Sequence, residues 1–111
     1  MPGRSGPGEF EQLVLLAVLQ CGEEAFAPEL GPLLERATGR RVSRGALYAT
    51  LERLERKRLL SWRLEKATPE RAGSRRRRFE VTPTGVEALR ASRAALLTLW
   101  RGLESTLRGG R

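Results

Sequence analysis

The sequence contains no histidine and a single cysteine, Cys21. Without histidine there is no imidazole to act as a general base or to bind a metal, and one cysteine cannot form an internal disulfide or a thiolate cage. Without these side chains, most of the catalytic groups and metal ligands found in enzyme active sites are missing. We therefore expect a protein that is not an enzyme and that needs no cofactor.

Long apolar runs are also absent. No segment approaches the roughly 20 consecutive apolar residues that cross a bilayer. The N-terminal stretch MPGRSGPGEF is polar and rich in glycine and proline, unlike a signal peptide. The sequence therefore predicts a cytoplasmic protein that does not insert into a membrane.

Positive charge is in excess, and it is unevenly distributed. The net charge is +8, yet residues 40–81 hold fourteen basic and five acidic side chains while residues 1–39 hold two and six. A basic middle segment favours binding to a polyanion, although charge alone does not distinguish DNA from RNA or an anionic membrane. At 111 residues the chain has room for one modest core, and domains of this size often gain stability by dimerising.

The segment 42–60, VSRGALYATLERLERKRLL, has the pattern of a helix with two different faces. Helical periodicity places four residues on a core-facing stripe: Leu47, Thr50, Leu51 and Leu54. The opposite face combines small residues with polar ones: Gly45, Tyr48, Ala49, Glu52 and Arg56. Ser43 occupies the N-cap position. An ordinary amphipathic core helix and a helix that enters a DNA major groove, roughly 12 Å wide, both fit this segment alone.

Two helices are expected before this segment. Residues 9–21, EFEQLVLLAVLQC, are apolar nearly all round, which predicts burial both in the domain and against a partner subunit. A second helix is expected from about Pro28 to Thr38, ended by Gly39. Residues 28–58 therefore have the pattern of a helix-turn-helix, which by itself is a weak signal of DNA binding.

The period changes to two after residue 59, which indicates strands. Leu60, Trp62 and Leu64 alternate with polar residues, and Phe79 and Val81 do so after a loop that contains Pro69 and Gly73. We expect a two-stranded wing with Trp62 packed beneath it. Its basic run is expected to meet phosphates or a minor groove rather than to form a solvated charge patch: Arg75, Arg76, Arg77 and Arg78.

The last segment has a heptad seam. Thr82 before Pro83 is an N-cap candidate, as is a capping box of Thr84 and Glu87. The seam runs through Val86, Leu89, Arg93, Leu96, Trp100, Leu103 and Leu107. About 26 residues would form a rod of roughly 39 Å, too long for so small a domain to cover. We expect an arm (1–8), a winged helix-turn-helix domain (9–81), a long dimerisation helix (82–108) and a tail (109–111), in a mainly α fold with a small two-stranded β-wing.

Four stretches together resemble the PadR family of winged helix-turn-helix transcriptional regulators, in its short form with a single C-terminal dimerisation helix. They are EFEQLVLLAVL at 9–19, VSRGALYATLERLERK at 42–57, RRRRFEVTPTGVEAL at 75–89 and the terminal helix. The resemblance covers residues 9–107. It departs at Arg58, where family members usually carry glycine, and at residues 25–30.

The resemblance implies a homodimeric repressor that binds a palindromic operator in double-stranded DNA. The DNA-binding residues expected from the pattern and the resemblance together are Ser43, Arg44, Gly45, Tyr48, Ala49, Arg56, Arg75, Arg76, Arg77 and Arg78. The expected dimer interface comprises Leu15, Leu16, Leu19, Leu89, Leu96, Trp100, Leu103 and Leu107. Some family members bind flat aromatic compounds between tryptophans of their paired helices, so Trp100 either lines a site for a small aromatic effector or is a plain dimer-core residue.

A protein-interaction module remains the alternative function. A winged helix could use its basic surface for an acidic protein partner, and Glu52 on the exposed face of the central helix supports this, since a carboxylate repels phosphate unless it accepts a cytosine amino hydrogen. A single-stranded RNA-binding role lacks an exposed aromatic platform. The operator, the target genes, the effector, the half-site spacing and the direction of regulation do not follow from the sequence.

Overall fold

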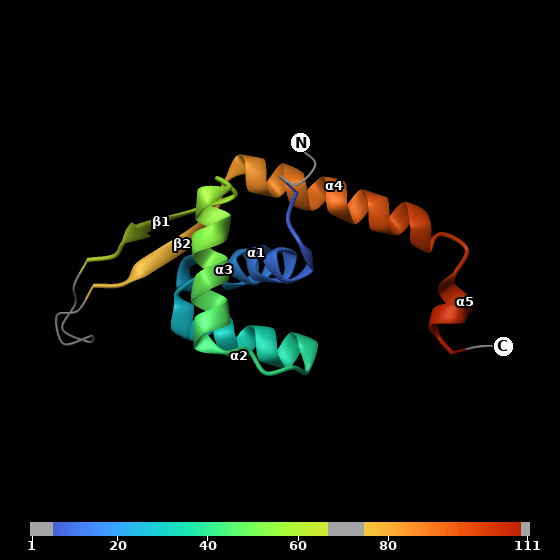
Figure 1. Ribbon diagram of the computed structural model, residues 1–111, viewed down its shortest axis with the longest axis horizontal. Coiled ribbons are helices and arrows are strands. Elements are labelled where there is room, and N and C mark those ends of the chain that lie inside the picture. Colours follow the sequence, from blue (N-terminus) through green and yellow to red (C-terminus); the bar gives the residue numbers. More distant parts are fainter. Residues whose placement is uncertain (1–5, 67–74, 110–111) are drawn as a thin grey trace.

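The computed structural model describes residues 6–66 and 75–109. Within these ranges it is mainly helical with one two-stranded antiparallel sheet, which confirms the predicted fold class (Figure 1). The elements in chain order are α1 (Glu9–Cys21), the short 3-10 turn η2 (Gly22–Glu24), α2 (Ala27–Thr38), α3 (Arg44–Arg56), β1 (Leu60–Leu64), β2 (Arg77–Val81), α4 (Pro83–Trp100) and α5 (Glu104–Leu107).

Local capping explains where the helices begin and end. The Ser43 hydroxyl accepts a hydrogen bond of 3.0 Å from the amide of Ala46 at the start of α3, as predicted. The Thr82 hydroxyl accepts one of 3.0 Å from the amide of Gly85, so Thr82 is the N-cap of α4 and the Thr84 capping box is not used. Gly39 ends α2 with a φ of +72°, a conformation that glycine adopts at little cost.

The core lies among α1, α2 and α3 and is closed by the inner face of the sheet. Apolar side chains of all four units meet there, in the helical and alternating patterns of the sequence: Val14, Leu15, Val18, Leu30, Leu34, Leu47, Leu51, Leu54, Leu60 and Phe79. The four residues predicted to face the core from α3 are all buried. Figure 1 shows these helices gathered around α1, with the two strands projecting to one side.

The sheet pairs Leu60 with Val81 and Trp62 with Phe79. The amide of Phe79 also donates a 2.9 Å hydrogen bond to the carbonyl of Ala25, so the chain between η2 and α2 lies against the other edge of β2. The wing is therefore attached to the helices at its base. The predicted turn residues Pro69 and Gly73 lie outside the described residues.

The connection from α3 to β1 contains an unusual backbone conformation. Arg58 has a φ of +63°, and it is the one residue other than glycine with a positive φ in the described ranges. Its carbonyl accepts a 2.8 Å hydrogen bond from the Thr82 hydroxyl. The position where the family resemblance led us to expect glycine thus does adopt a glycine-like conformation, with arginine in place.

The C-terminal helix is shorter than predicted. α4 ends at Trp100, Gly102 follows with a φ of +83°, and α5 is a separate short turn of helix. The expectation of one continuous helix over residues 82–108 is therefore wrong, because Gly102 costs about 1 kcal/mol in a helix interior and accepts a left-handed turn that other residues resist. The 18 residues of α4 extend over roughly 27 Å.

Only the beginning of α4 packs on the rest of the chain. Gly85 and Leu89 are its buried residues, and Figure 1 shows the remainder extending away from the other helices. The apolar side chains beyond this point are exposed: Leu96, Leu97, Leu99, Trp100, Leu103 and Leu107. The described residues leave this apolar surface without a partner.

Candidate nucleic-acid interface

The outer face of α3 is open over its whole length. Arg44, Gly45, Ala49, Glu52 and Arg56 are exposed there, opposite the buried leucines, as the two-faced pattern predicted. A Cβ built on Gly45 would meet nothing within 4 Å, so another surface could approach the backbone closely at this point. A single α-helix with such an open face fits the width of a major groove.

Tyr48 lies where α3 faces the wing. Its ring is half-buried, and the guanidinium of Arg44 is 6.0 Å from the ring centroid. Two hollows of about 240 and 430 Å³ adjoin at Tyr48 and share Ala27 and Pro28 on the wall that α2 provides. Arg44 lines the first hollow and Arg75 the second. The first hollow lies between α2 and α3, and the second lies between the helices and the wing, where Arg76 and Arg77 line it as well.

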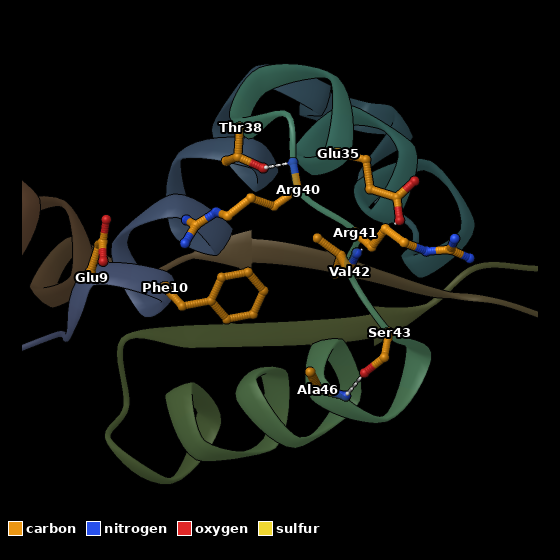
Figure 2. Close-up of a pocket in the computed structure, with 9 residues that line it drawn as sticks. All are labelled: Glu9, Phe10, Glu35, Thr38, Arg40, Arg41, Val42, Ser43 and Ala46. Carbon is orange, nitrogen blue, oxygen red and sulfur yellow. Dashed lines mark hydrogen bonds between the residues drawn. The ribbon is translucent and has the colours of Figure 1, made fainter.

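Two hydrogen bonds hold the turn between α2 and α3, which carries two arginines. Glu35 accepts a 2.8 Å hydrogen bond from the amide of Val42, and Thr38 accepts one of 3.2 Å from the amide of Arg40. Figure 2 shows the Arg40 side chain crossing the hollow toward Phe10 while Arg41 extends in the other direction. Arg40 and Arg41 were not among the predicted site residues, although a basic pair just before an N-cap serine would have been a usable signal.

The four consecutive arginines of the wing are not equivalent. Arg76 stacks on Phe26, 3.7 Å from the ring centroid, and lies 3.9 Å from a carboxylate oxygen of Glu29. Arg78 binds Glu65 at 2.8 Å and Glu80 at 3.5 Å. Acidic residues of the same domain already pair with Arg76 and Arg78, which leaves less of their charge for a phosphate, and the expectation that the whole run contacts DNA stays a prediction.

The other two wing arginines differ from each other in their exposure and in their contacts. Arg75 is exposed and lies at the edge of the described part of the wing. Arg77 is half-buried, and its guanidinium lies 5.0 Å from the centroid of the Trp62 ring. Trp62 itself is 36% exposed, but it is paired with the buried Phe79 and its indole reaches Glu55 of α3, so it lies on the inner face of the ribbon, as predicted. It lies outside the core because the sheet extends past the helices that cover its base.

A buried carboxylate neutralises the last turn of α3. Glu11 on α1 lies 2.7 Å from Arg53 and 2.8 Å from Lys57, and it also accepts a 2.8 Å hydrogen bond from the amide of Gly8. Burial raises the pKa of Glu11, but the hydrogen bonds from Lys57, Gly8 and Arg53 outweigh it and hold the pKa below its ordinary value. Lys57 also donates to the carbonyl of Gly6, so residues 6–8 of the predicted arm are tied to α3.

These pairings distinguish two groups among the basic residues around α3 and the wing. Arg53, Lys57, Arg63, Arg76 and Arg78 each have an acidic partner. Within the described ranges, none of a second group has an ion pair: Arg40, Arg41, Arg44, Arg56 and Arg75. This second group lies on the α2–α3 turn, the outer face of α3 and the wing. Their charge is available to an external anion.

An apolar groove lies between α1 and α4, apart from the basic surface. It encloses about 490 Å³ and is lined by Leu16 and Leu19 from α1 and by Leu89, Leu96, Leu97 and Trp100 from α4, with Arg90 and Arg93 at its edge. Leu15 was predicted to belong to the same interface but is fully buried in the core of its own domain, so that prediction is wrong. Leu103 and Leu107 are exposed but lie beyond the break at Gly102.

Other classes of site find no support in the described residues. No group of three or more histidine, cysteine, aspartate or glutamate side chains in residues 6–66 and 75–109 could hold a metal ion. None of the helices in these ranges is both long and apolar enough to span a bilayer. Burial raises the pKa of the Cys21 thiol, with Glu29 acting in the same direction, which favours the protonated thiol over the nucleophilic thiolate.

Comparison with known proteins gives a consistent answer. The model of the transcriptional regulator PadR-like family matches residues 15–91. A solved PadR-like transcription factor from Bacteroides fragilis is 27% identical over 90% of this chain and 87% of its own, with a TM-score of 0.60. A MarR family transcription regulator is 26% identical, with a TM-score of 0.61, over 96% of this chain and 67% of its own.

A PadR-like transcriptional regulator from Bacillus cereus strain ATCC 14579 shares the fold, with a TM-score of 0.67 at 24% identity over 90% of this chain and 88% of its own. No curated protein is similar enough to count as a match.

Proposed function

Because this chain belongs to the PadR-like family of transcriptional regulators, we propose that it is a homodimeric repressor that binds a palindromic operator through α3 and the wing. DNA-binding regulation of transcription, and not catalysis, is the activity of this family. Dimerisation, repression and the residues that contact DNA are the proposal. The observation that carries it is the group of unpaired arginines on the outer face of α3, the turn before it and the wing.

In this proposal α3 enters the major groove with its N-terminal half leading. Ser43, Gly45 and Ala49 present little bulk, so the backbone of α3 lies close to the base edges, while Arg44 and Tyr48 reach the flanking phosphates and bases. Arg40 and Arg41 precede the helix and Arg75 lines the second hollow at Tyr48. Arg56 and Arg77 extend the basic surface, and Arg76 and Arg78 shape the wing rather than contact phosphate.

The same proposal assigns the apolar groove between α1 and α4 to the dimer interface. Leu16, Leu19, Leu96 and Trp100 are each between 41% and 52% exposed, although they are large and apolar. A continuous exposed patch of this kind is typical of a protein interface. A two-fold axis through the paired helices would present two copies of α3 to one face of DNA, which requires an operator with matching symmetry.

We place any small aromatic effector at Trp100, in the groove between the paired helices. The indole lies beside Leu96 and Leu97, and the groove is mainly apolar with two arginines at its edge. Flat apolar compounds with a polar or anionic substituent fit such a lining. Quenching of tryptophan fluorescence by a panel of planar aromatics, lost in Trp100→Phe, would support this site, and no quenching across the panel would end it.

The experiment that tests the proposed function is a mobility-shift titration of the purified protein against its own promoter region, with excess nonspecific DNA and at two salt concentrations. A repressor of this kind is expected to retain the promoter fragment in the presence of competitor, with two chains per site. Retention that disappears with competitor would instead favour the protein-interaction module. Transcription in vitro from the same promoter, with and without protein, distinguishes repression from activation.

A further inference from the structure

We propose that Glu52 selects a cytosine in each operator half-site by accepting a hydrogen bond from its exocyclic amino group. This inference rests on the proposed function, because it requires α3 to lie in the major groove. With this role Glu52 gains a base preference, whereas without it the negative charge of Glu52 would only oppose DNA binding.

The position of Glu52 on α3 supports this role. Gly45, Ala49, Glu52 and Arg56 follow one another at intervals of four, three and four residues, so they form one exposed stripe. A Cβ at Gly45 would have open space around it, and Ala49 adds only a methyl group. Bases that approach α3 along this stripe therefore meet no bulky side chain before Glu52.

The lack of an internal partner distinguishes Glu52 from its neighbours. Glu55, the other carboxylate of α3, accepts a hydrogen bond from the indole of Trp62. Glu29, Glu35, Glu65 and Glu80 each bind an arginine or a backbone amide. Between residues 25 and 80, in the described part of the chain, Glu52 alone among the carboxylates has no hydrogen bond and no ion pair. Its carboxylate is exposed and free to meet a donor.

The chemistry of the major groove then restricts what that donor can be. An ionised carboxylate only accepts hydrogen bonds. Guanine presents two acceptors, and thymine an acceptor and a methyl group, so neither satisfies it. Adenine presents a donor beside the acceptor N7, which repels the second carboxylate oxygen. Cytosine presents an amino donor without an adjacent acceptor on the same base, and it is the base that a carboxylate suits.

The test is selection of binding sites from a random double-stranded DNA pool by the full-length wild type, Glu52→Gln, Glu52→Ala and the control Glu104→Gln. Glu104 is exposed and lies on α5, far from the wing in Figure 1, so the control makes the same charge change away from the proposed interface. We expect wild type and Glu104→Gln to enrich the same half-sites, with cytosine at one position.

That position is expected to lose its preference in Glu52→Ala and to change to adenine in Glu52→Gln, since glutamine pairs with adenine N6 and N7. Replacing the cytosine should weaken wild-type binding by about ten- to a hundredfold and Glu52→Ala binding by about twofold or less. Circular dichroism melting of each variant verifies that the exposed substitution leaves the fold intact.

Two outcomes would overturn the inference while leaving the proposed function in place. Glu52→Ala could enrich the same sequence as the wild type, or it could bind every sequence more tightly with unchanged preference, which would mean that Glu52 only repels phosphate. A wild-type protein that binds DNA but enriches no sequence would instead contradict the proposed function, and the inference with it.

Discussion

The indole N–H of Trp62 on β1 donates a hydrogen bond to the carboxylate of Glu55 on α3. Arg77 lies over the same indole from the neighbouring strand, with its guanidinium 5.0 Å from the ring centroid. α3 and the wing are thus linked through one aromatic side chain that the core does not bury. In the proposed function both elements contact DNA, so we expect this link to help set the angle between them.

Replacing Trp62 with phenylalanine keeps an aromatic surface for Arg77 but removes the donor to Glu55. We expect DNA affinity to fall by about three- to tenfold, the equivalent of one hydrogen bond of about 0.5–1.5 kcal/mol. The free energy of unfolding should fall by no more than the same amount, because the bond is exposed. Fluorescence anisotropy with a labelled promoter fragment measures the effect, and unchanged affinity would show that the link does not orient the wing.

The division of the arginines into paired and unpaired groups predicts different salt dependences. Replacing Arg44 or Arg75 with alanine should lower the slope of log affinity against log salt concentration by about 0.9 for each phosphate that the variant no longer neutralises. Replacing Arg63, which is paired with Glu80, is the matched control and should leave the slope unchanged. Equal effects at all three positions would mean that the internal ion pairs open when DNA binds.

Glu11 gives the stability a predictable dependence on pH. Its pKa is lowered in the folded protein, so its contribution is complete above the unfolded pKa of about 4.3 and is lost as the pH falls toward the lower folded value. Glu11→Gln should reduce the free energy of unfolding by about 1–3 kcal/mol at pH 7. Urea titrations should show this difference shrinking below about pH 4.3. A difference that stays constant down to pH 2 would contradict the assignment.

Arg58 predicts a stabilising substitution. A left-handed conformation costs a residue with a side chain about 1–2 kcal/mol, so Arg58→Gly should raise the free energy of unfolding by about 0.5–1 kcal/mol. Arg56→Gly is the control, because that residue is the last of α3 and has right-handed helical geometry, so the substitution should be destabilising by up to about 1 kcal/mol. Destabilisation at both positions would show that the arginine side chain at residue 58 outweighs its strain.

The exposed apolar groove predicts the effect of charge on oligomeric state. Leu96→Arg places a charge inside the groove and should convert a dimer into monomers at micromolar concentration, as measured by analytical ultracentrifugation. Leu99 is 74% exposed and does not line the groove, so Leu99→Arg is the control and should remain dimeric. Dissociation by both variants would place the interface over a wider part of α4.

Local patterns predicted most of the fold. The helical spacing of Leu47, Leu51 and Leu54, and the N-caps at Ser43 and Thr82, depend on residues close in sequence, and the structure confirms each of them. The heptad spacing predicted a helix that was too long at the C-terminus. The spacing continues through Gly102, although glycine commonly ends a helix. Spacing measures where side chains would lie in a helix and not whether the helix forms.

The site was less predictable than the fold. Whether an arginine is free depends on which carboxylates the tertiary structure brings beside it, and Glu29 and Arg76 are far apart in the sequence. The same applies to Glu11, which neutralises Arg53 and Lys57 from another helix. A run of four arginines therefore indicated the region of the wing, but its composition could not show that two of the four were already paired.

Gly85 fixes the rotation of α4 about its own axis. A Cβ at this position would lie 2.3 Å from the carbonyl oxygen of Leu59, so this one edge of the helix must face the start of β1. Each residue turns an α-helix by about 100°. Inserting a single residue between Val81 and Gly85 would therefore have one of two effects. Either Gly85 would no longer face the Leu59 carbonyl, or α4 would rotate so that Leu96 and Trp100 point away from α1. The smallest residue in the helix sets the direction in which its largest side chains point.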